Sequence, residues 1–184
     1  LIITALLYLS YFGIETSKFN SEIKKQIKNK YDFVDLNFSK IKLLLDLKDL
    51  SVKLQTKNID LNIYNNKITI NKLSTKISIA SYFNNKFAIE NFQLKTEETE
   101  INSLINITRK FYNNLEMTLI DKVVENGKVL INADIEFNDD GSLANNYKLD
   151  GKVINTNLLL INRKPINKLN FDFLIQNKNY KFKE

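Results

Sequence analysis

The feature of this sequence that most constrains its fold is a two-residue alternation of apolar and polar side chains, which begins at Tyr31. Successive side chains of a strand point to opposite faces, so the alternation predicts strands with one apolar and one polar face. Breaks at intervals of roughly ten residues predict a long antiparallel sheet of short strands. The apolar positions of its first strands are Leu43, Leu45, Leu47, Leu50, Val52, Leu54, Ile59, Leu61, Ile63, Ile68 and Ile70.

Asparagine supplies most of the predicted turns, because the chain has only four glycines and one proline. Asparagine tolerates the left-handed region of backbone space and bonds its own backbone. The pairs Asn65-Asn66 and Asn84-Asn85 predict hairpin turns, and the strongest turn signal is Asn138-Asp139-Asp140-Gly141. Later strands are expected at 115–119, 129–137, 147–153, 158–161 and 169–175, with Pro165 in the loop before the last one.

Two segments have a helical period instead. Residues 16–30 place apolar side chains four residues apart among lysines, at Phe19, Ile23 and Ile27. Residues 100–112 place on one stripe Ile101, Leu104, Ile105, Thr108, Phe111 and Tyr112. Ser17 and Thr99 are the candidate N-caps. The lysine-rich first helix suits either a lipid surface or the end of the following sheet, and these two roles are compatible. The expected fold class is α+β, mainly β with two helices.

The first thirteen residues, LIITALLYLSYFG, carry no charge. They are shorter than the roughly 20 apolar residues that span a bilayer. We therefore expect the C-terminal part of a membrane anchor helix at 1–14, in a chain that is a piece of a longer protein. A signal peptide or a buried helix is the alternative, although no small-residue cleavage site follows. The expected organisation continues with an amphipathic helix at 15–30 and a β-region at 31–184, interrupted by the second helix.

The net charge of +6 comes almost entirely from lysine, since Arg109 and Arg163 are the only arginines. Lysine alternates with aspartate and glutamate along the predicted strands, which favours a solvated polar face over a nucleic-acid groove. We therefore expect no nucleic-acid partner. Because the chain has no cysteine and no histidine, disulfides, thiol catalysis, histidine metal sites and Ser-His triads are excluded.

The acidic clusters have structural explanations. Glu97, Glu98 and Glu100 precede the second helix, where acids complement the helix dipole. Asp139 and Asp140 lack the remaining ligands of a calcium loop, so a turn is expected there. The sequence thus predicts no catalytic residues, no metal site and no cofactor, and the protein is not expected to be an enzyme.

The order of these elements resembles a known family. An uncharged N-terminal segment, a short amphipathic helix and the strands of FSKIKLLLDLKDLSVKLQTKNIDLNI resemble the start of AsmA-like proteins. This group includes TamB and YhdP and is related to the chorein-type bridge-like lipid transfer proteins of eukaryotes. The stretch VLINADIEFNDDGSLANNYKLDGKVINTNLLL resembles the repeating strands of the same group. The resemblance covers most of the chain and rests on element order and texture, without an invariant motif.

The resemblance implies a long antiparallel sheet curled into an open groove, whose apolar lining holds phospholipid acyl chains. It implies a function in lipid transport or outer-membrane homeostasis between the two membranes of a Gram-negative bacterium. The expected location is a single-pass anchor in the inner membrane with the β-region in the periplasm, beside unidentified envelope protein partners. Lys18 to Lys30 would favour the cytoplasm by the positive-inside rule, so the orientation depends on charge before the anchor. The alternative is a membrane-tethered interaction domain, a closed sandwich or barrel without lipid cargo.

Overall fold

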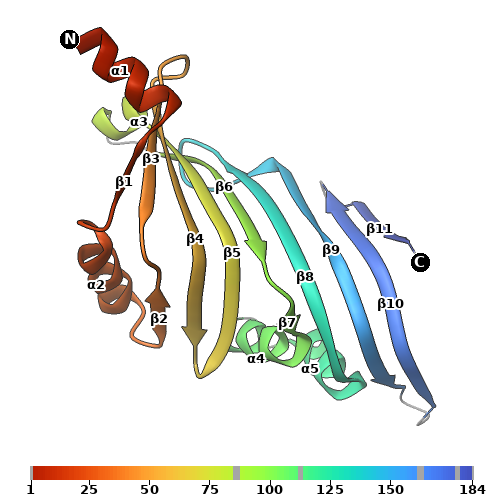
Figure 1. The fold of residues 1–184 in the computed structure, drawn as a ribbon. Helices are drawn as coiled ribbons and strands as arrows, with labels where there is room; N and C mark the ends of the chain where they lie inside the picture. Colours follow the sequence, from red (N-terminus) through yellow and green to blue (C-terminus); the bar gives the residue numbers. More distant parts are fainter. Residues whose placement is uncertain (1, 85–87, 112–113, 161–163, 177–178, 184) are drawn as a thin grey trace.

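The structure, a computed structural model, describes residues 2–84, 88–111, 114–160, 164–176 and 179–183. Within these ranges, eleven strands form one open antiparallel sheet (Figure 1). The strands are β1 (Ile14–Thr16), β2 (Val34–Asn37), β3 (Ile41–Asp46), β4 (Ser51–Ile63), β5 (Asn66–Ser78), β6 (Ile89–Thr96), β7 (Thr99–Glu100), β8 (Val124–Phe137), β9 (Leu143–Leu159), β10 (Pro165–Gln176) and β11 (Asn179–Lys183).

The expected fold class is confirmed in its coarser part, a mainly antiparallel β protein with helices. The helices of the described residues are α1 (Ile2–Tyr11), α2 (Asn20–Lys30), α3 (Ile79–Phe83), α4 (Ile101–Phe111) and α5 (Leu115–Val123). Two of them, α2 and α4, correspond to the predicted helices. No described helix has the length and apolarity needed to cross a membrane.

The strands follow one another across the sheet in almost their sequence order. The path runs β1-β3-β4-β5-β6-β8-β9-β10-β11, with β2 paired to β4 and β7 paired to β8. β2 and β3 therefore share one side of β4, with Leu36 opposite Leu61 and Leu43 opposite Leu54. Neighbouring strands that are consecutive in sequence need only local connections, which is the simplest way to build a wide antiparallel sheet.

A backbone kink lies in the middle of β4. In the part of β4 before the kink, the apolar residues have even numbers, such as Leu54. In the part after the kink, they have odd numbers, such as Leu61. Both leucines nevertheless pack against the same buried cluster. Asn58 lies between them with a φ of 51°, and a left-handed residue inside a strand can reverse the alternation of its side chains. The kink therefore keeps one apolar face along a strand whose sequence pattern changes phase.

The neighbouring strand β5 changes phase at the same level. Its apolar residues are Ile68 and Ile70 before the phase change and Leu73 after it. All three belong to the buried cluster or pack against it. The pairing of β5 with β6 has a register shift between Ile70 and Lys72. The alternation in the sequence predicts separate short strands on either side of these phase changes. That expectation is wrong, because β4 and β5 are continuous through them.

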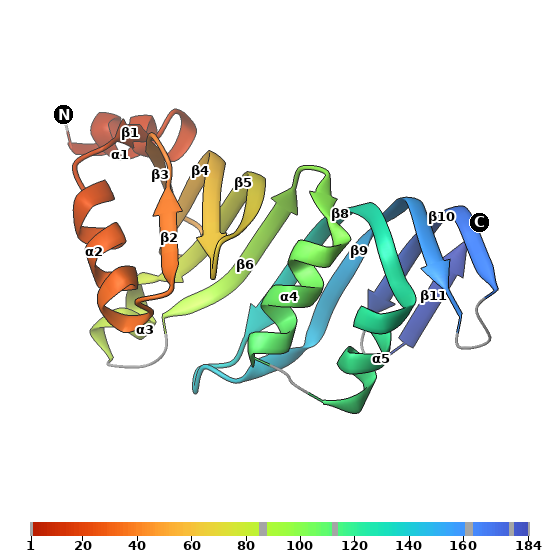
Figure 2. The ribbon, with the colours of Figure 1, turned by 90° about the horizontal axis from the view of Figure 1, so that it is seen from below.

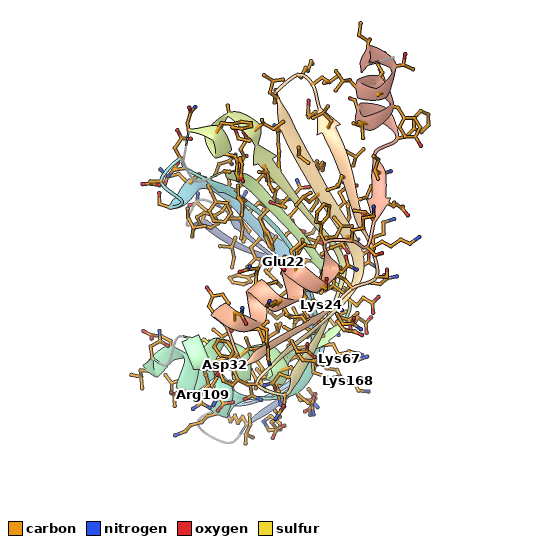
Figure 3. The ribbon with its side chains drawn as sticks, turned by 90° about the vertical axis from the view of Figure 1, so that its left-hand side faces the viewer. Glu22, Lys24, Asp32, Lys67, Arg109 and Lys168 are labelled. Carbon is orange, nitrogen blue, oxygen red and sulfur yellow. The ribbon has the colours of Figure 1, made fainter. Side chains whose placement is uncertain are left out.

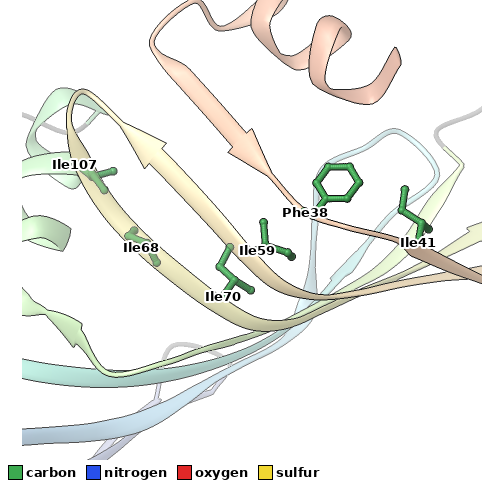
Figure 4. Close-up of a cluster of buried hydrophobic side chains, with 6 residues drawn as sticks. All are labelled: Phe38, Ile41, Ile59, Ile68, Ile70 and Ile107. Atoms are coloured by element: carbon green, nitrogen blue, oxygen red, sulfur yellow. The ribbon is translucent and has the colours of Figure 1, made fainter. Parts of the chain in front are cut away.

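Helices cover one end of the apolar face. The buried cluster there consists of Phe38, Ile41, Ile59, Ile68, Ile70 and Ile107 (Figure 4). Ile107 comes from α4, and Ile23 of α2 packs against the cluster from its edge. In Figure 2, which looks from below, α4 and α5 lie on one side of the sheet and α2 flanks the edge formed by β2. The predicted role of the first helix at the end of the sheet agrees with this packing.

Several local predictions need correction. Residues 115–119 form a helix and not a strand, because the Asn114 side chain accepts a hydrogen bond from the Met117 N–H and caps α5. Ser17 does not cap α2, whose N-cap residue is Phe19 without a side-chain bond. Thr99 lies in β7, and its hydroxyl donates to the Glu97 carbonyl.

On the predicted stripe of α4, Ile105 is buried but Thr108 is exposed, and the second buried residue of the helix is Ile107, which the stripe did not include. Tyr112, also assigned to that stripe, lies outside the described residues. Of the strand expected at 158–161, the first two residues are the end of β9, Leu160 follows the strand, and Ile161 lies outside the described residues. Pro165 is the first residue of β10 and not a loop residue. A strand accepts proline at its first position because no ladder donor is lost there.

The hairpin turn predicted at Asn65-Asn66 is present but lies one residue earlier, because Asn66 is the first residue of β5. The β4–β5 hairpin turns at Tyr64 and Asn65, whose φ values are 47° and 66°. The β8–β9 turn is closed by the Gly141 N–H, which donates to the Asn138 carbonyl at 2.9 Å. The turn expected at Asn84-Asn85 falls partly outside the described residues, and α3 occupies the connection between β5 and β6.

Candidate functional site

The candidate site is a band of apolar side chains that crosses one face of the sheet beyond the helix-covered cluster. Directly paired residues of an antiparallel sheet share a face, so the strand registers define the band. One row passes through Leu73, Leu94, Ala133, Leu149 and Ile175. With its flanking rows it forms the apolar belt: Leu43, Leu45, Val52, Leu54, Leu73, Ile77, Phe92, Leu94, Ile131, Ala133, Ile135, Leu149, Val153, Phe171, Phe173 and Ile175.

The apolar belt is less covered than the cluster under the helices. Ile59, Ile68 and Ile70 in the cluster are 1%, 7% and 4% exposed. Every belt residue except the buried Ala133 is half-buried. α4 contacts β5, β7 and β8, and α5 contacts β8 and β9, but these contacts leave the belt side chains partly open to solvent. The face thus has a dry end and a partly exposed middle.

The structure divides the apolar residues that the sequence analysis singled out into three groups. Leu43, Leu45, Val52 and Leu54 lie in the apolar belt, and two of them, Leu43 and Leu54, also border the cluster and pack against it. Ile59, Leu61, Ile63, Ile68 and Ile70 belong to the helix-covered cluster or pack against it. Leu47 and Leu50 lie in the loop between β3 and β4, where they are 39% and 60% exposed.

The larger part of the apolar belt lies in β6 to β10, whose residues were not among the predicted lining. The alternation in 129–137 and 169–175 predicts these strands, but it does not say which residues face one another across them. Only the registers place Phe92 opposite Ile135 and Phe171 opposite Val153. The missing information is non-local, because pairing partners lie up to several tens of residues apart.

Close packing in the belt depends on Gly151. It lies opposite Ile131 and Phe173 in the neighbouring strands. A Cβ atom at this position would come within 2.0 Å of the Leu130 carbonyl oxygen and 2.7 Å of the Phe173 ring. The glycine therefore lets the Phe173 ring lie against the strand. Near the C-terminal edge, a shallow hollow of about 400 Å³ is lined by Leu169, Phe171, Phe182 and Lys183.

The opposite face of the same strands is polar and internally paired. Asp134 accepts hydrogen bonds from the side-chain amides of Asn91 and Gln93, at 2.5 and 3.0 Å. Asp150 accepts a hydrogen bond from Asn132 at 2.9 Å, and Lys148 lies 2.9 Å from its other oxygen. Neutral amides solvate the Asp134 carboxylate, and Lys148 compensates the charge of Asp150, so both acids are satisfied within this face.

The electrostatics of Asp150 illustrate this compensation. Partial burial by itself raises the pKa of the Asp150 carboxyl, because desolvation penalises the charged form. Hydrogen bonds from Asn132 and Lys148 and the lysine charge outweigh that effect, and the pKa is below its ordinary value. Asp150 is thus held ionised as part of a structural ladder across β8 and β9.

Among the residues that the structure describes, no group of three or more acidic side chains is placed to hold a metal ion. No protein-family model, curated protein or solved structure matches this chain.

Proposed function

We propose that the apolar belt binds phospholipid acyl chains, in an envelope protein that transports lipid between membranes or maintains the outer membrane. The observation that carries the proposal is the continuity of the belt. Its rows run from β3 to β10 without a charged side chain among the residues that define it. A surface of this kind can hold a hydrocarbon chain by burial alone, with each buried CH₂ contributing roughly 0.8 kcal/mol.

The open sheet supports lipid over the alternative of a closed domain. In a sandwich or barrel, a second sheet or closure of the first would bury the belt side chains. In the described residues the belt side chains stay half-buried, although helices bury the adjoining cluster fully. The resemblance to AsmA-like proteins supports the same proposal, since it implies an open groove, an inner-membrane anchor and a periplasmic β-region.

The test uses a matched pair of leucines on one strand. Leu43 and Leu44 are neighbours in β3, both are half-buried, and they point to opposite faces of the sheet. The purified chain is mixed with phospholipid that carries a photoreactive group in its acyl chain. After irradiation, lipid adducts are mapped by mass spectrometry. We expect adducts on belt residues, fewer of them in Leu43→Asn, and an unchanged yield in Leu44→Asn.

The same experiment can reject the proposal. Adducts spread equally over the belt and the polar face would show that the lipid binds without regard to the sheet. Absence of adducts on a chain whose circular dichroism shows a folded β protein would favour the membrane-tethered interaction domain. A second matched pair, Ile175→Asn and Leu174→Asn in β10, repeats the comparison at the other end of the belt.

A further inference from the structure

A second apolar surface lies at one end of the sheet, outside the apolar belt. It is formed by α1, by the loop between β3 and β4, and by α3, three elements far apart in the sequence. Their exposed side chains include Tyr11 (77%), Phe12 (66%), Leu50 (60%), Tyr82 (69%) and Phe83 (77%). Figure 1 and Figure 3 both place these three elements at the same end, and in Figure 3 the loop lies between the two helices. We call this surface the apolar end.

Hydrogen bonds fix α3 beside the loop. The Ile79 N–H at the start of α3 donates to the Leu50 carbonyl at 3.1 Å. The Ser78 hydroxyl accepts a hydrogen bond from the Ser81 N–H at 3.1 Å and caps the helix. Lys76 bonds Asp49 of the loop at 2.5 Å. The exposed side chains of the loop and of α3 are therefore presented together by bonded backbone segments.

The apolar end carries little unpaired charge. Neither residues 1–13 nor residues 79–84 contain a charged side chain. In the loop, Asp49 is neutralised by Lys76, and the pKa of its carboxyl is lowered, chiefly by the hydrogen bond from that lysine. The other charged residue of the loop, Lys48, is exposed. Moving this end into the interfacial layer of a bilayer would thus cost little in charge desolvation, because Asp49 is paired and the flexible side chain of Lys48 can keep its ammonium group in the headgroup layer.

We propose that the apolar end is a membrane-contact site, with α3 and the β3–β4 loop inserting into the interfacial region of the bilayer beside α1. Exposed apolar residues scattered singly need no explanation, but a cluster from three elements marks an interaction surface. A bilayer that receives the uncharged α1 also meets α3 and the loop, because they lie at the same end. Tyrosine suits this position, since its ring is apolar and its hydroxyl stays in the headgroup layer.

This contact goes beyond the proposed lipid binding and does not require the apolar belt to carry cargo. The sheet is held at the bilayer by α1, α3 and the β3–β4 loop instead of by α1 alone, so the strands of the belt end at the bilayer surface. A lipid leaving that surface would meet the upper residues of the belt first, such as Leu45 and Ile77 in the row next to the loop and α3.

The absence of tryptophan from the chain provides the test. Three single-tryptophan variants are made: Tyr8→Trp in α1, Phe83→Trp in α3 and Leu115→Trp in α5. The three replaced side chains are 56%, 77% and 72% exposed, and α5 lies at the opposite end of the sheet (Figure 1). Each variant is mixed with vesicles of phosphatidylethanolamine and phosphatidylglycerol that carry brominated acyl chains. Circular dichroism checks that each variant is folded.

We expect the emission of the tryptophans at 8 and 83 to shift to shorter wavelength and to be quenched, and that at 115 to stay unchanged. Quenching at 8 without quenching at 83 would overturn the contact by α3. Equal quenching at 83 and 115 would show binding without preference for this end and would also overturn it. Absence of quenching at all three positions would overturn the proposed membrane contact. The apolar end would then be assigned to a protein partner or to a second copy of the chain.

A paired substitution keeps the proposal testable without a probe. The double variant Tyr82→Ser and Phe83→Ser removes two rings from the apolar end, and Leu115→Ser with Leu119→Ser removes two exposed side chains from α5. We expect the first pair to lower partitioning into the same vesicles by at least about tenfold, since each ring buries a large apolar area. The second pair should leave partitioning within about twofold of the unmodified chain. Equal losses in both pairs would contradict the assignment.

Discussion

Asn58 controls the course of β4, because it is the residue at which the alternation of apolar side chains changes phase. Its φ of 51° lies in the left-handed region, which asparagine and glycine adopt more readily than β-branched residues. We expect Asn58→Gly to retain the free energy of unfolding and Asn58→Val to lower it by about 1–2 kcal/mol. Chemical denaturation measures both values.

The control for this substitution lies four residues away in the same strand. Asn62 pairs with Lys67 in regular extended geometry, where valine is well tolerated. Asn62→Val should therefore keep the stability of the parent chain. Equal stability of the glycine and valine variants at position 58 would contradict the role assigned to its backbone conformation.

At the scale of the element, α4 shows how a helix closes one end of an open sheet. Ile107 is 8% exposed and reaches the buried cluster, whereas the next residue, Thr108, is exposed. We expect Ile107→Ala to lower the free energy of unfolding by about 2–4 kcal/mol, since it removes buried methyl groups and leaves a cavity. Thr108→Ala should change it by less than about 0.5 kcal/mol. Thermal or denaturant unfolding of both variants measures the two changes and shows which face of α4 is buried against the sheet.

The elements that sequence reasoning identified correctly are those with a local signal. The alternation in 129–137 is a property of one strand, and β8 contains it. Residues 115–119 also alternate, but the amide hydrogen bond from Met117 to Asn114 makes that segment helical. Separate short strands are expected from the sequence on either side of Asn58 and of Asn155, but each of these asparagines is a left-handed residue inside a continuous strand. Asparagine supports both roles, so its presence alone does not distinguish a turn from a kink.

At the scale of the whole molecule, the candidate site is a product of register. The sequence shows that Leu94, Ala133 and Leu149 belong to strands, but the row that joins them exists only through pairing across the sheet. For the same reason the sequence could not separate the covered cluster from the apolar belt. That division depends on where α4 folds back, a tertiary event that no local pattern encodes.

The outer edge of β10 permits a prediction about association. β11 pairs with Asp172 to Gln176 only, so the described residues leave the first half of β10 without a neighbour on that side. Pro165 begins this half, and Lys168 interrupts it with a φ of 56°. Proline, lysine and backbone irregularity all disfavour pairing with another chain. We expect Pro165→Val with Lys168→Val to cause concentration-dependent association, measured by analytical ultracentrifugation.

A lysine on a fully paired strand provides the comparison. Lys152 lies in β9 between β8 and β10 and is exposed on the polar face. Lys152→Val adds similar apolar surface without freeing a strand edge, so it should leave the sedimentation behaviour unchanged. If this variant associates as strongly as the edge variant, general hydrophobicity and not edge pairing is responsible.

The irregular edge of β10 bears on how an open sheet avoids pairing with other chains. Closing a sheet into a barrel abolishes both edges, and it would also seal the apolar side chains inside. A sheet that must remain accessible along one face keeps its edges, and every edge is a template for polymerisation. Short border strands such as β1 and β2, together with the interrupted half of β10, let this molecule stay unrolled without growing into fibres. An open sheet exposes edges that can pair with other chains, and the border strands of this sheet disfavour that pairing.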